Sequence, residues 1–267
     1  MDSRLLSVDE FYARLTVYML EVGLPWDERE EGEWPQRIAE EGAALTAVMA
    51  EAKGRSVLDC SCGWGRQALP LAQAGWKVTA TDATEANLDI ARRRATRLGL
   101  SIGFRLCYMR ELGAHFREAF DWVVSCFALY EITTDEGIQQ ALGGMLGALR
   151  PGGKCYLRLR DMDFLIDEDR PRYVFHGETR TPHGRVLCVE DWGYESDTHV
   201  IDTEAFLIED ERYDDYGRWQ TDVLSYRRRA LRRTELEQFL AAAGFADVEF
   251  LPPGGPWEPH QVVATKA

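Results

Sequence analysis

Long apolar segments are absent from this chain of 267 residues. It contains no run of about eighteen apolar residues, which a helix needs in order to cross a bilayer. The opening MDSRLLSVDEF also lacks the continuous apolar core of a signal peptide. We therefore expect a soluble, cytoplasmic protein with no membrane partner.

Positive charge is scarce. The chain has 31 Lys and Arg residues against 45 Asp and Glu residues, a formal net charge of −14. Binding to phosphate backbones requires many cationic contacts, so we expect no nucleic-acid partner. Two local basic runs, 92–94 and 227–233, are most simply explained as solvated faces.

Cysteine and histidine are few, with six and five residues respectively. The cysteines lie mostly in or beside predicted buried strands, which indicates reduced thiols and not a disulfide framework. The pair Cys60 and Cys62 has no second pair and no histidine at metal-ligand spacing. The sequence therefore predicts no metal site.

Strand and helix patterns alternate through most of the chain. Short apolar runs predict strands at 57–58, 78–80, 102–106, 120–127 and 154–159, with helical patterns between several of them. A turn is expected at 151–153, and Thr234 with Glu237 predicts a capping box on a helix that ends at Gly244. Strands at 248–251 and 261–265 follow. This order is typical of an α/β fold with a mostly parallel sheet.

Residues 56–84 read as a strand, a glycine turn, a short helix and a second strand that ends at Asp82. Gly63 and Gly65 let the backbone turn tightly, and an acid at the end of the second strand can meet ribose hydroxyls. The spacing of Gly63, Gly65 and Ala68 also fits the dinucleotide fingerprint. The glycines alone therefore leave two cofactor classes open.

Asp59 distinguishes these two classes. It lies four positions before Gly63, at the expected carboxyl edge of the first strand. A pyrophosphate there would be repelled, whereas a ligand with an ammonium and a sulfonium would gain about 1 to 4 kcal/mol from an opposite charge a few Å away. S-adenosylmethionine carries both cations, so the sequence predicts this cofactor.

At these residues the chain resembles the class I S-adenosylmethionine-dependent methyltransferases. Asp59, Cys62, Gly63 and Gly65 are similar to the D-x-x-C-G-T-G motif of the glycine and sarcosine N-methyltransferase group, with Ser61 in place of the usual first glycine. The resemblance implies a Rossmann-like sheet, mostly parallel with a reversed last strand. It also implies an N-terminal helical cap and an antiparallel insertion.

The motif and the resemblance together imply a set of cofactor-binding residues. Arg37 lies in an R-x-A-E segment similar to one that binds the cofactor carboxylate in that group, although a surface ion pair is an equal alternative. Tyr108 stands where this class often has an adenine-facing acid or amide, which leaves the adenine contacts open. The full set is Arg37, Asp59, Cys60, Ser61, Gly63, Gly65, Asp82, Ala83, Tyr108, Met109 and Ser125.

On the substrate side the resemblance implies catalytic roles for Arg160, Tyr226, Tyr18 and Glu131. Arg160 matches an arginine that holds a substrate carboxylate, and pairing with a neighbouring aspartate is the alternative. Tyr226 would lie over the pocket or fill the core of the insertion. Glu131 would contact the acceptor or serve as an acid at a helix start.

The acceptor is expected to be larger or more apolar than glycine, because Phe127 and Ala128 replace the family's Gly-Asn pair. We expect methyl transfer to a small molecule, in the first place to the nitrogen of an amine or amino acid. O-methylation of a phenol or acid and cofactor binding without turnover are the alternatives, and homo-oligomer formation is left open.

The expected domain organisation has four parts. They are a helical cap at 1–50, a cofactor-binding core at 51–160, an antiparallel insertion over the active site at 161–232, and a C-terminal helix and strands at 233–267 that complete the core sheet.

Overall fold

The computed structural model describes residues 5–7, 10–11, 34–49, 55–167, 173–181, 184–195, 199–213, 219–252 and 260–267. Contacts between these residues divide the chain into two compact units. The first comprises Met1–Trp34 and Leu165–Ala230, and the second comprises Pro35–Phe164 and Leu231–Ala267. Because α2 (Trp34–Val48) falls almost entirely in the second unit, that unit begins before the first strand.

The second unit is an α/β domain. Its strands are β1 (Ser56–Cys60), β2 (Lys77–Asp82), β3 (Gly103–Leu106), β4 (Phe120–Cys126), β5 (Leu149–Leu159), β10 (Phe245–Leu251) and β11 (His260–Lys266). Its helices are α2, α3 (Ala68–Gln73), α4 (Glu85–Arg97), α5 (Leu112–His115), α6 (Asp135–Ala148) and α8 (Arg233–Ala243). Two short 3₁₀ turns, η1 (Met109–Glu111) and η2 (Leu129–Glu131), follow β3 and β4, and α7 (Met162–Asp167) follows β5.

The seven strands form one sheet in the order β10-β11-β5-β4-β1-β2-β3. Strands β1 to β5 pair in parallel, whereas β11 pairs antiparallel with both β5 and β10. The expected fold class, a mostly parallel Rossmann-like sheet with a reversed last strand, is confirmed. Ligands in open parallel sheets bind beyond the carboxyl ends of the strands, so the loops after β1, β2, β4 and β5 define where the site must be sought.

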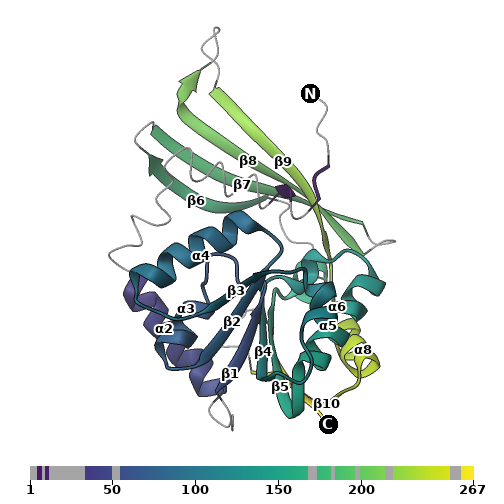
Figure 1. Ribbon diagram of the computed structural model, residues 1–267. Coiled ribbons are helices and arrows are strands. Elements are labelled where there is room, and N and C mark those ends of the chain that lie inside the picture. Colours follow the sequence, from purple (N-terminus) through teal and green to yellow (C-terminus); the bar gives the residue numbers. More distant parts are fainter. Residues whose placement is uncertain are drawn as a thin grey trace. The chain divides into compact units, whose positions relative to one another are not determined.

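Helices cover both faces of this sheet (Figure 1). On one face, side chains of α2, α3 and α4 pack with β1, β2, β4 and β5 in a single cluster that includes Leu45, Leu71 and Trp122. On the other face α6 contacts β4, β5 and α8. Burial on both faces explains why Val57 and Leu58, adjacent in a strand and directed to opposite sides, are both fully buried.

A polar cluster joins three segments at the amino edge of the sheet. Asp121 of β4 accepts hydrogen bonds from the backbone nitrogen and hydroxyl of Ser56, and Arg150 donates to its other oxygen at 2.9 Å. Burial raises the pKa of Asp121, but the bonds from Ser56 and Arg150 outweigh burial and hold its pKa below the ordinary value. The charged carboxylate therefore stabilises the start of β1.

The first unit contains a four-stranded antiparallel sheet. Its strands, in the order β6-β7-β8-β9, are β6 (Tyr173–Thr181), β7 (Gly184–Glu195), β8 (Val200–Tyr213) and β9 (Trp219–Arg229). The expected insertion is thus an antiparallel sheet of four strands. The four-part division of the chain remains a prediction.

Two local expectations are wrong. The helix α8 begins at Arg233, so Thr234 and Glu237 form no capping box; instead Glu235 accepts from the backbone nitrogen of Arg232 at 3.0 Å. The expected turn at 151–153 is a bulge inside β5, where the pairing with β4 shifts between Leu149 and Lys154. Both differences come from long-range contacts, because the start of α8 is also held by Asp163, which accepts from the Arg233 nitrogen at 2.9 Å.

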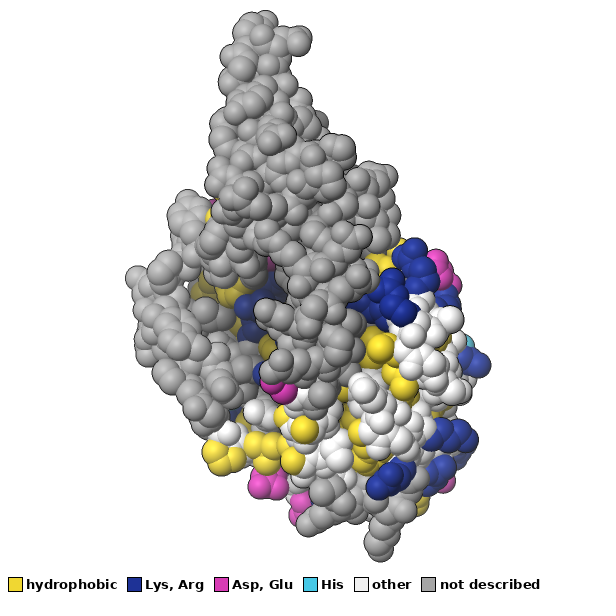
Figure 2. All heavy atoms as spheres, turned by 90° about the vertical axis from the view of Figure 1, so that its left-hand side faces the viewer, with side chains coloured by type: hydrophobic (Ala, Val, Ile, Leu, Met, Phe, Trp, Pro, Cys, Tyr) yellow, Lys and Arg dark blue, Asp and Glu magenta, His cyan; other side chains and the backbone are white. Residues whose placement is uncertain are grey.

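The basic run 92–94 does not form a single solvated patch. Arg92 is paired with Glu85 at 2.6 Å and with Asp89 at 2.8 Å, and Arg94 is buried. Figure 2 shows the described Lys and Arg side chains of one face in separate groups, with neutral side chains between them. Among the described residues, no helix is both long enough and apolar enough to cross a membrane.

Candidate functional site

The loop after β1 is a tight turn held by the neighbouring strand. The backbone nitrogens of Ser61 and Cys62 both donate to the carbonyl of Thr81 at 2.8 Å. The φ angles of Ser61, Gly63 and Gly65 are 84°, 52° and 88°, the left-handed region that favours glycine. Three positive φ values within five residues fold the backbone back on itself and bring its amides to the carboxyl edge of the sheet.

Asp82 holds this turn to the start of α4. Its Oδ2 accepts from the Gly63 nitrogen at 2.8 Å, and its Oδ1 accepts from the Thr84 nitrogen at 2.9 Å and from Asn87 Nδ2 at 3.2 Å. A carboxylate offers about four lone-pair sites. The predicted binding of both ribose hydroxyls would therefore require at least one of these three bonds to be exchanged.

Asn87, Trp64 and Arg94 extend this network and were not predicted from the sequence. Trp64 Nε1 donates to Asn87 Oδ1 at 3.0 Å, and Arg94 donates to the Trp64 carbonyl at 3.2 Å while its guanidinium lies 5.4 Å from the ring. Asn87 and Arg94 are seven residues apart on the buried side of α4. The sequence signal that could have identified Asn87 and Arg94 is their helical spacing on an otherwise apolar face of this helix.

Asp59 is fully buried in β1. The strand register places it in one row with Ala80 of β2 and Val124 of β4, on the face that carries the apolar cluster. A buried carboxylate is costly to keep charged unless charged or hydrogen-bonding groups face it. Its retention next to the glycine turn is consistent with the predicted contact to a cationic ligand group.

The thiols beside Asp59 are not nucleophiles. Burial raises the pKa of Cys60 and of Cys62 well above the ordinary value, and the Asp59 charge raises both further. The Cys60 thiol donates to the carbonyl of Val124 at 3.3 Å, so its side chain is directed to β4. Cys60 can therefore contribute to the turn only through its backbone.

Three of the predicted cofactor residues meet at the ends of β1, β3 and β4. The hydroxyls of Ser61 and Ser125 are 3.4 Å apart, and Ser125 Oγ donates to the sulfur of Met109 at 3.7 Å. Tyr108 precedes Met109, and the guanidinium of Arg110 lies 5.3 Å from its ring. Ala83 is half-buried directly after Asp82. These residues border the same edge as the glycine turn.

Two predicted substrate-side residues lie after β4 and β5. Arg160 is half-buried and its Nε donates to the hydroxyl of Tyr130 at 3.4 Å. Glu131 ends η2, whereas α6 begins at Asp135 after the cap of Thr134. Glu131 is thus an acid of the short 3₁₀ turn η2 and not of α6, and its contact with the acceptor remains a prediction.

For the three remaining predicted residues, Tyr226, Arg37 and Tyr18, no described side-chain contact with this edge is available. Tyr226 is fully buried in the first unit, where it stacks on Phe11 at 3.8 Å and donates to Glu190 at 3.4 Å. It therefore fills the core of the antiparallel unit. Arg37 lies in α2 and its side chain is not among those described; Tyr18 lies outside the described residues.

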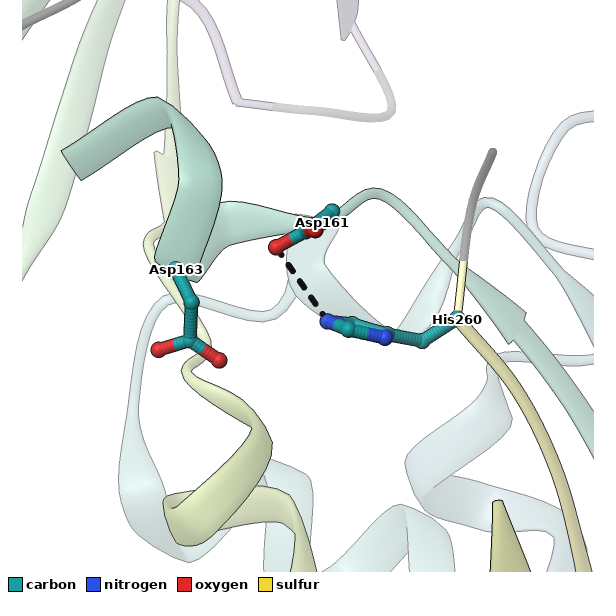
Figure 3. A group of neighbouring side chains, drawn as sticks. All are labelled: Asp161, Asp163 and His260. Atoms are coloured by element: carbon teal, nitrogen blue, oxygen red, sulfur yellow. Dashed lines mark ion pairs between the residues drawn. The ribbon is translucent and has the colours of Figure 1, made fainter. Parts of the chain in front are cut away.

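Asp161, Asp163 and His260 form the one described cluster whose atoms are close enough to hold a metal ion. Figure 3 shows Asp161 turned toward the His260 ring, and its Oδ1 lies 3.2 Å from Nε2. Asp163, however, is occupied by Arg232 at 3.0 Å and by the backbone nitrogen of Arg233. Arg232 and the Arg233 nitrogen already bind the Asp163 carboxylate, so the three residues fit a structural contact between neighbouring segments better than a metal site.

The fold and the glycine turn match a known family. Residues 57–153, a little over a third of the chain, match the family described as a methyltransferase domain. Together with the sheet order and the reversed β11, this match gives the second unit a Rossmann-like methyltransferase fold.

The curated relatives are named as O-methyltransferases, whereas the similar solved structures include a sugar N-methyltransferase. A ubiquinone biosynthesis O-methyltransferase of Methylocella silvestris is 36% identical over 104 residues, which cover 39% of this chain and 39% of that protein. One of Caulobacter vibrioides is 36% identical over 111 residues, which cover 42% of this chain and 43% of that protein. The chain thus spans about two fifths of the length of the curated relatives that it matches.

Among solved structures, a sugar N-methyltransferase of Streptoalloteichus sp. is similar with a TM-score of 0.70 and 17% identity, over 89% of this chain and 90% of that one. An amino pentose methyltransferase of Micromonospora echinaspora, solved with S-adenosylmethionine bound, gives a TM-score of 0.68 and 19% identity over 91% and 98%. At these identities the likeness establishes the fold. Membership of the glycine and sarcosine N-methyltransferase group remains a prediction.

Proposed function

We propose that this protein binds S-adenosylmethionine at the loop after β1 and transfers its methyl group to a small-molecule acceptor. The observation that carries the proposal is the turn at Ser61–Gly65, which Asp82 holds at the carboxyl edge of the sheet beside the buried Asp59. The match of 57–153 to a methyltransferase domain supports it.

The residues of this edge fit that cofactor. Gly63 and Gly65 carry no side chain, which allows close approach of the methionine part, and Asp59 supplies the negative charge that its ammonium requires. When bound, S-adenosylmethionine supplies an electrophilic methyl group on a sulfonium. The protein then has to bind, orient and desolvate the acceptor, and needs no covalent nucleophile.

We propose nitrogen as the acceptor atom. The structural neighbours include sugar and amino pentose methyltransferases, and an amine requires no base once it is bound in its neutral form. Oxygen is the second candidate, because the curated relatives that match about two fifths of this chain are named as O-methyltransferases. Rates measured for matched amines and phenols at one pH separate the two, since transfer to amines alone supports nitrogen and transfer to phenols alone supports oxygen.

Calorimetry with S-adenosylmethionine, with its demethylated product and with NAD tests the cofactor. Asp59→Asn should weaken binding of S-adenosylmethionine by fivefold to several hundredfold, which corresponds to about 1 to 4 kcal/mol for the lost charge. Asp89→Asn makes the same chemical change at an exposed site of α4 and should leave the affinity unchanged. Equal affinities for wild type and Asp59→Asn, or binding of NAD in place of S-adenosylmethionine, contradict the proposal.

Turnover is tested separately. The protein is incubated with methyl-labelled cofactor and pooled amines, amino sugars, phenols and carboxylic acids, and labelled products are identified by mass spectrometry. Labelled amines support the proposal, and labelled phenols or acids support the second candidate. Tight cofactor binding without transfer to any pool would instead favour a binding protein that has lost turnover.

A further inference from the structure

Three side chains, one each from β4, β5 and β11, form a row across the sheet on the face that carries Asp59. Arg158 of β5 pairs with Cys126 of β4 on one side and with Gln261 of β11 on the other. Tyr156, two residues earlier in β5, lies on the same face and in the row that contains Val124, the neighbour of Asp59. With strands about 4.8 Å apart, Arg158 is about 10 Å from the β1 strand on the same face.

These side chains line a cavity of about 210 Å³ within the second unit. Its polar lining comes from Gln67, Tyr156, Arg158 and Gln261, and Ala44 and Leu45 of α2 contribute apolar surface. Arg158 is the charged side chain among these described lining residues. The volume is below the roughly 300 Å³ at which pockets for drug-sized ligands begin, so the cavity suits a small molecule or one end of a larger one.

The guanidinium of Arg158 has no anionic partner among the described residues. Its Nε is buried and donates no hydrogen bond in this part of the chain. Leaving a buried donor unsatisfied is costly, and more so when the group is charged. Other arginines of this unit are paired with carboxylates, namely Arg150 with Asp121 and Arg232 with Asp163.

Phe127 holds this guanidinium in place. Its ring centroid lies 5.2 Å from Arg158 Cζ, and its backbone nitrogen donates to the Arg158 carbonyl at 2.7 Å. Phe127 has a φ of 58°, a strained conformation for a non-glycine residue. The chain therefore tolerates backbone strain at the end of β4, where an aromatic ring packs on a cation that no described carboxylate pairs with.

We propose that this cavity binds a carboxylate of the acceptor substrate, with Arg158 as the anchoring cation. A guanidinium fork matches a carboxylate through two parallel hydrogen bonds. Gln261 adds a second donor, because its Oε1 accepts from the Tyr156 hydroxyl at 2.8 Å and its amide nitrogen donates no hydrogen bond among the described residues. This inference rests on the proposed methyl transfer and names its substrate class: a small acceptor that carries a carboxylate.

The assignment places the carboxylate contact at Arg158 in place of Arg160, the residue implied by the family resemblance. Arg160 already donates to Tyr130, whereas Arg158 lines the cavity. The two residues are close in sequence and have the same side chain, so they allow a direct comparison of variants.

Calorimetry with benzoate as the probe tests the site, in the presence and absence of the demethylated cofactor. Wild type should bind benzoate in a saturable manner and should bind benzamide at least tenfold more weakly. Arg158→Gln should weaken benzoate binding at least tenfold, Arg158→Lys should weaken it less, and both should leave the affinity for S-adenosylmethionine unchanged. Arg117→Gln is the control at an exposed position.

Stability separates an anchoring role from a structural one. Because Arg158 has no anionic partner among the residues that the structure describes, Arg158→Met should leave the Tm of the cofactor-free protein unchanged or raise it, even though the packing on Phe127 changes. A marked fall in Tm with unchanged benzoate affinity would overturn the proposal. So would a loss of benzoate binding in Arg160→Gln but not in Arg158→Gln, or binding of inorganic phosphate at least tenfold tighter than benzoate.

The two levels of the proposal fail in different ways. If wild type does not bind S-adenosylmethionine, methyl transfer is refuted whatever the benzoate result. If S-adenosylmethionine binds and benzoate does not, methyl transfer stands and the carboxylate site is refuted.

Discussion

Ser61 occupies a backbone conformation that glycine would adopt with less strain. Its φ of 84° lies in the left-handed region, and its nitrogen is fixed there by the bond to Thr81. A left-handed conformation costs an L-residue about 1 to 2 kcal/mol. Glycine avoids this strain but loses about 0.5 to 1 kcal/mol more chain entropy on folding. Ser61→Gly should therefore stabilise the protein by about 1 kcal/mol.

Thermal unfolding without cofactor measures this effect. For a protein of this size, about 1 kcal/mol corresponds to a Tm increase of about 2 to 4 °C. Ser61→Ala keeps the strain and loses the contact with the Ser125 hydroxyl, so its Tm should not rise. Ser101→Gly is the matched control, because Ser101 is exposed and has no positive φ; glycine there should lower the Tm.

The Tm values of Ser61→Gly, Ser61→Ala and Ser101→Gly together test whether the left-handed φ of Ser61 lowers stability. If Ser61→Gly is no more stable than Ser61→Ala, the left-handed strain at this turn is not a real cost. Phe127 provides a second check, because it too has a positive φ but its ring packs on Arg158. A cation–π contact is worth about 0.5 to 2 kcal/mol, so Phe127→Gly should show little or no net gain.

Three further predictions concern the turn, the amino edge of the sheet and the thiols. A Cβ added at Gly65 would lie 3.0 Å from Leu69, whereas one at Gly63 meets nothing within 4 Å; Gly65→Ala should therefore lower the Tm more than Gly63→Ala, and equal losses would argue against the close contact. The lowered pKa of Asp121 means that its contribution to stability is fully present above about pH 5 and is lost as pH falls through the ordinary value of 3.8 toward the folded one. Asp121→Asn should accordingly flatten the fall in unfolding free energy between pH 5 and pH 3 in urea titrations, and an unchanged slope would refute this role. Burial raises the pKa of Cys155 to about 12, so this thiol should resist iodoacetamide at pH 8 until the protein is unfolded, as peptide mass spectrometry would show.

Local patterns were sufficient for the α/β core. The apolar runs, the glycines and the acids at 59 and 82 predicted β1, the turn and β2, because each of these features depends on residues close together in the chain. The reversed last strand followed from the family resemblance and is confirmed by the pairing of β11 with β5. The glycine and sarcosine subgroup and the N-acceptor rested on short segments and remain predictions.

Local patterns failed where distant segments meet. The start of α8 depends on Asp163, about 70 residues earlier, and the bulge at 150–153 depends on how β5 pairs with β4. The predicted contact of Asp82 with a ribose remains a prediction, but the sequence did not indicate the bonds of Asp82 to Gly63, Thr84 and Asn87. Hydrogen-bond partners of a side chain are set by packing, which the spacing of residues along the chain does not encode.

The sequence by itself determined the class of fold and the cofactor hypothesis, since both rest on a contiguous segment in which strand, turn and charge follow one another. Only the tertiary structure showed that Arg158, Cys126 and Gln261 form one row, and that a guanidinium without a carboxylate partner in the described part of the chain lines a cavity on the same face as Asp59. The physical reason is strand register: residues separated by more than 30 positions become neighbours only when the sheet aligns them, and burial then makes a missing partner costly.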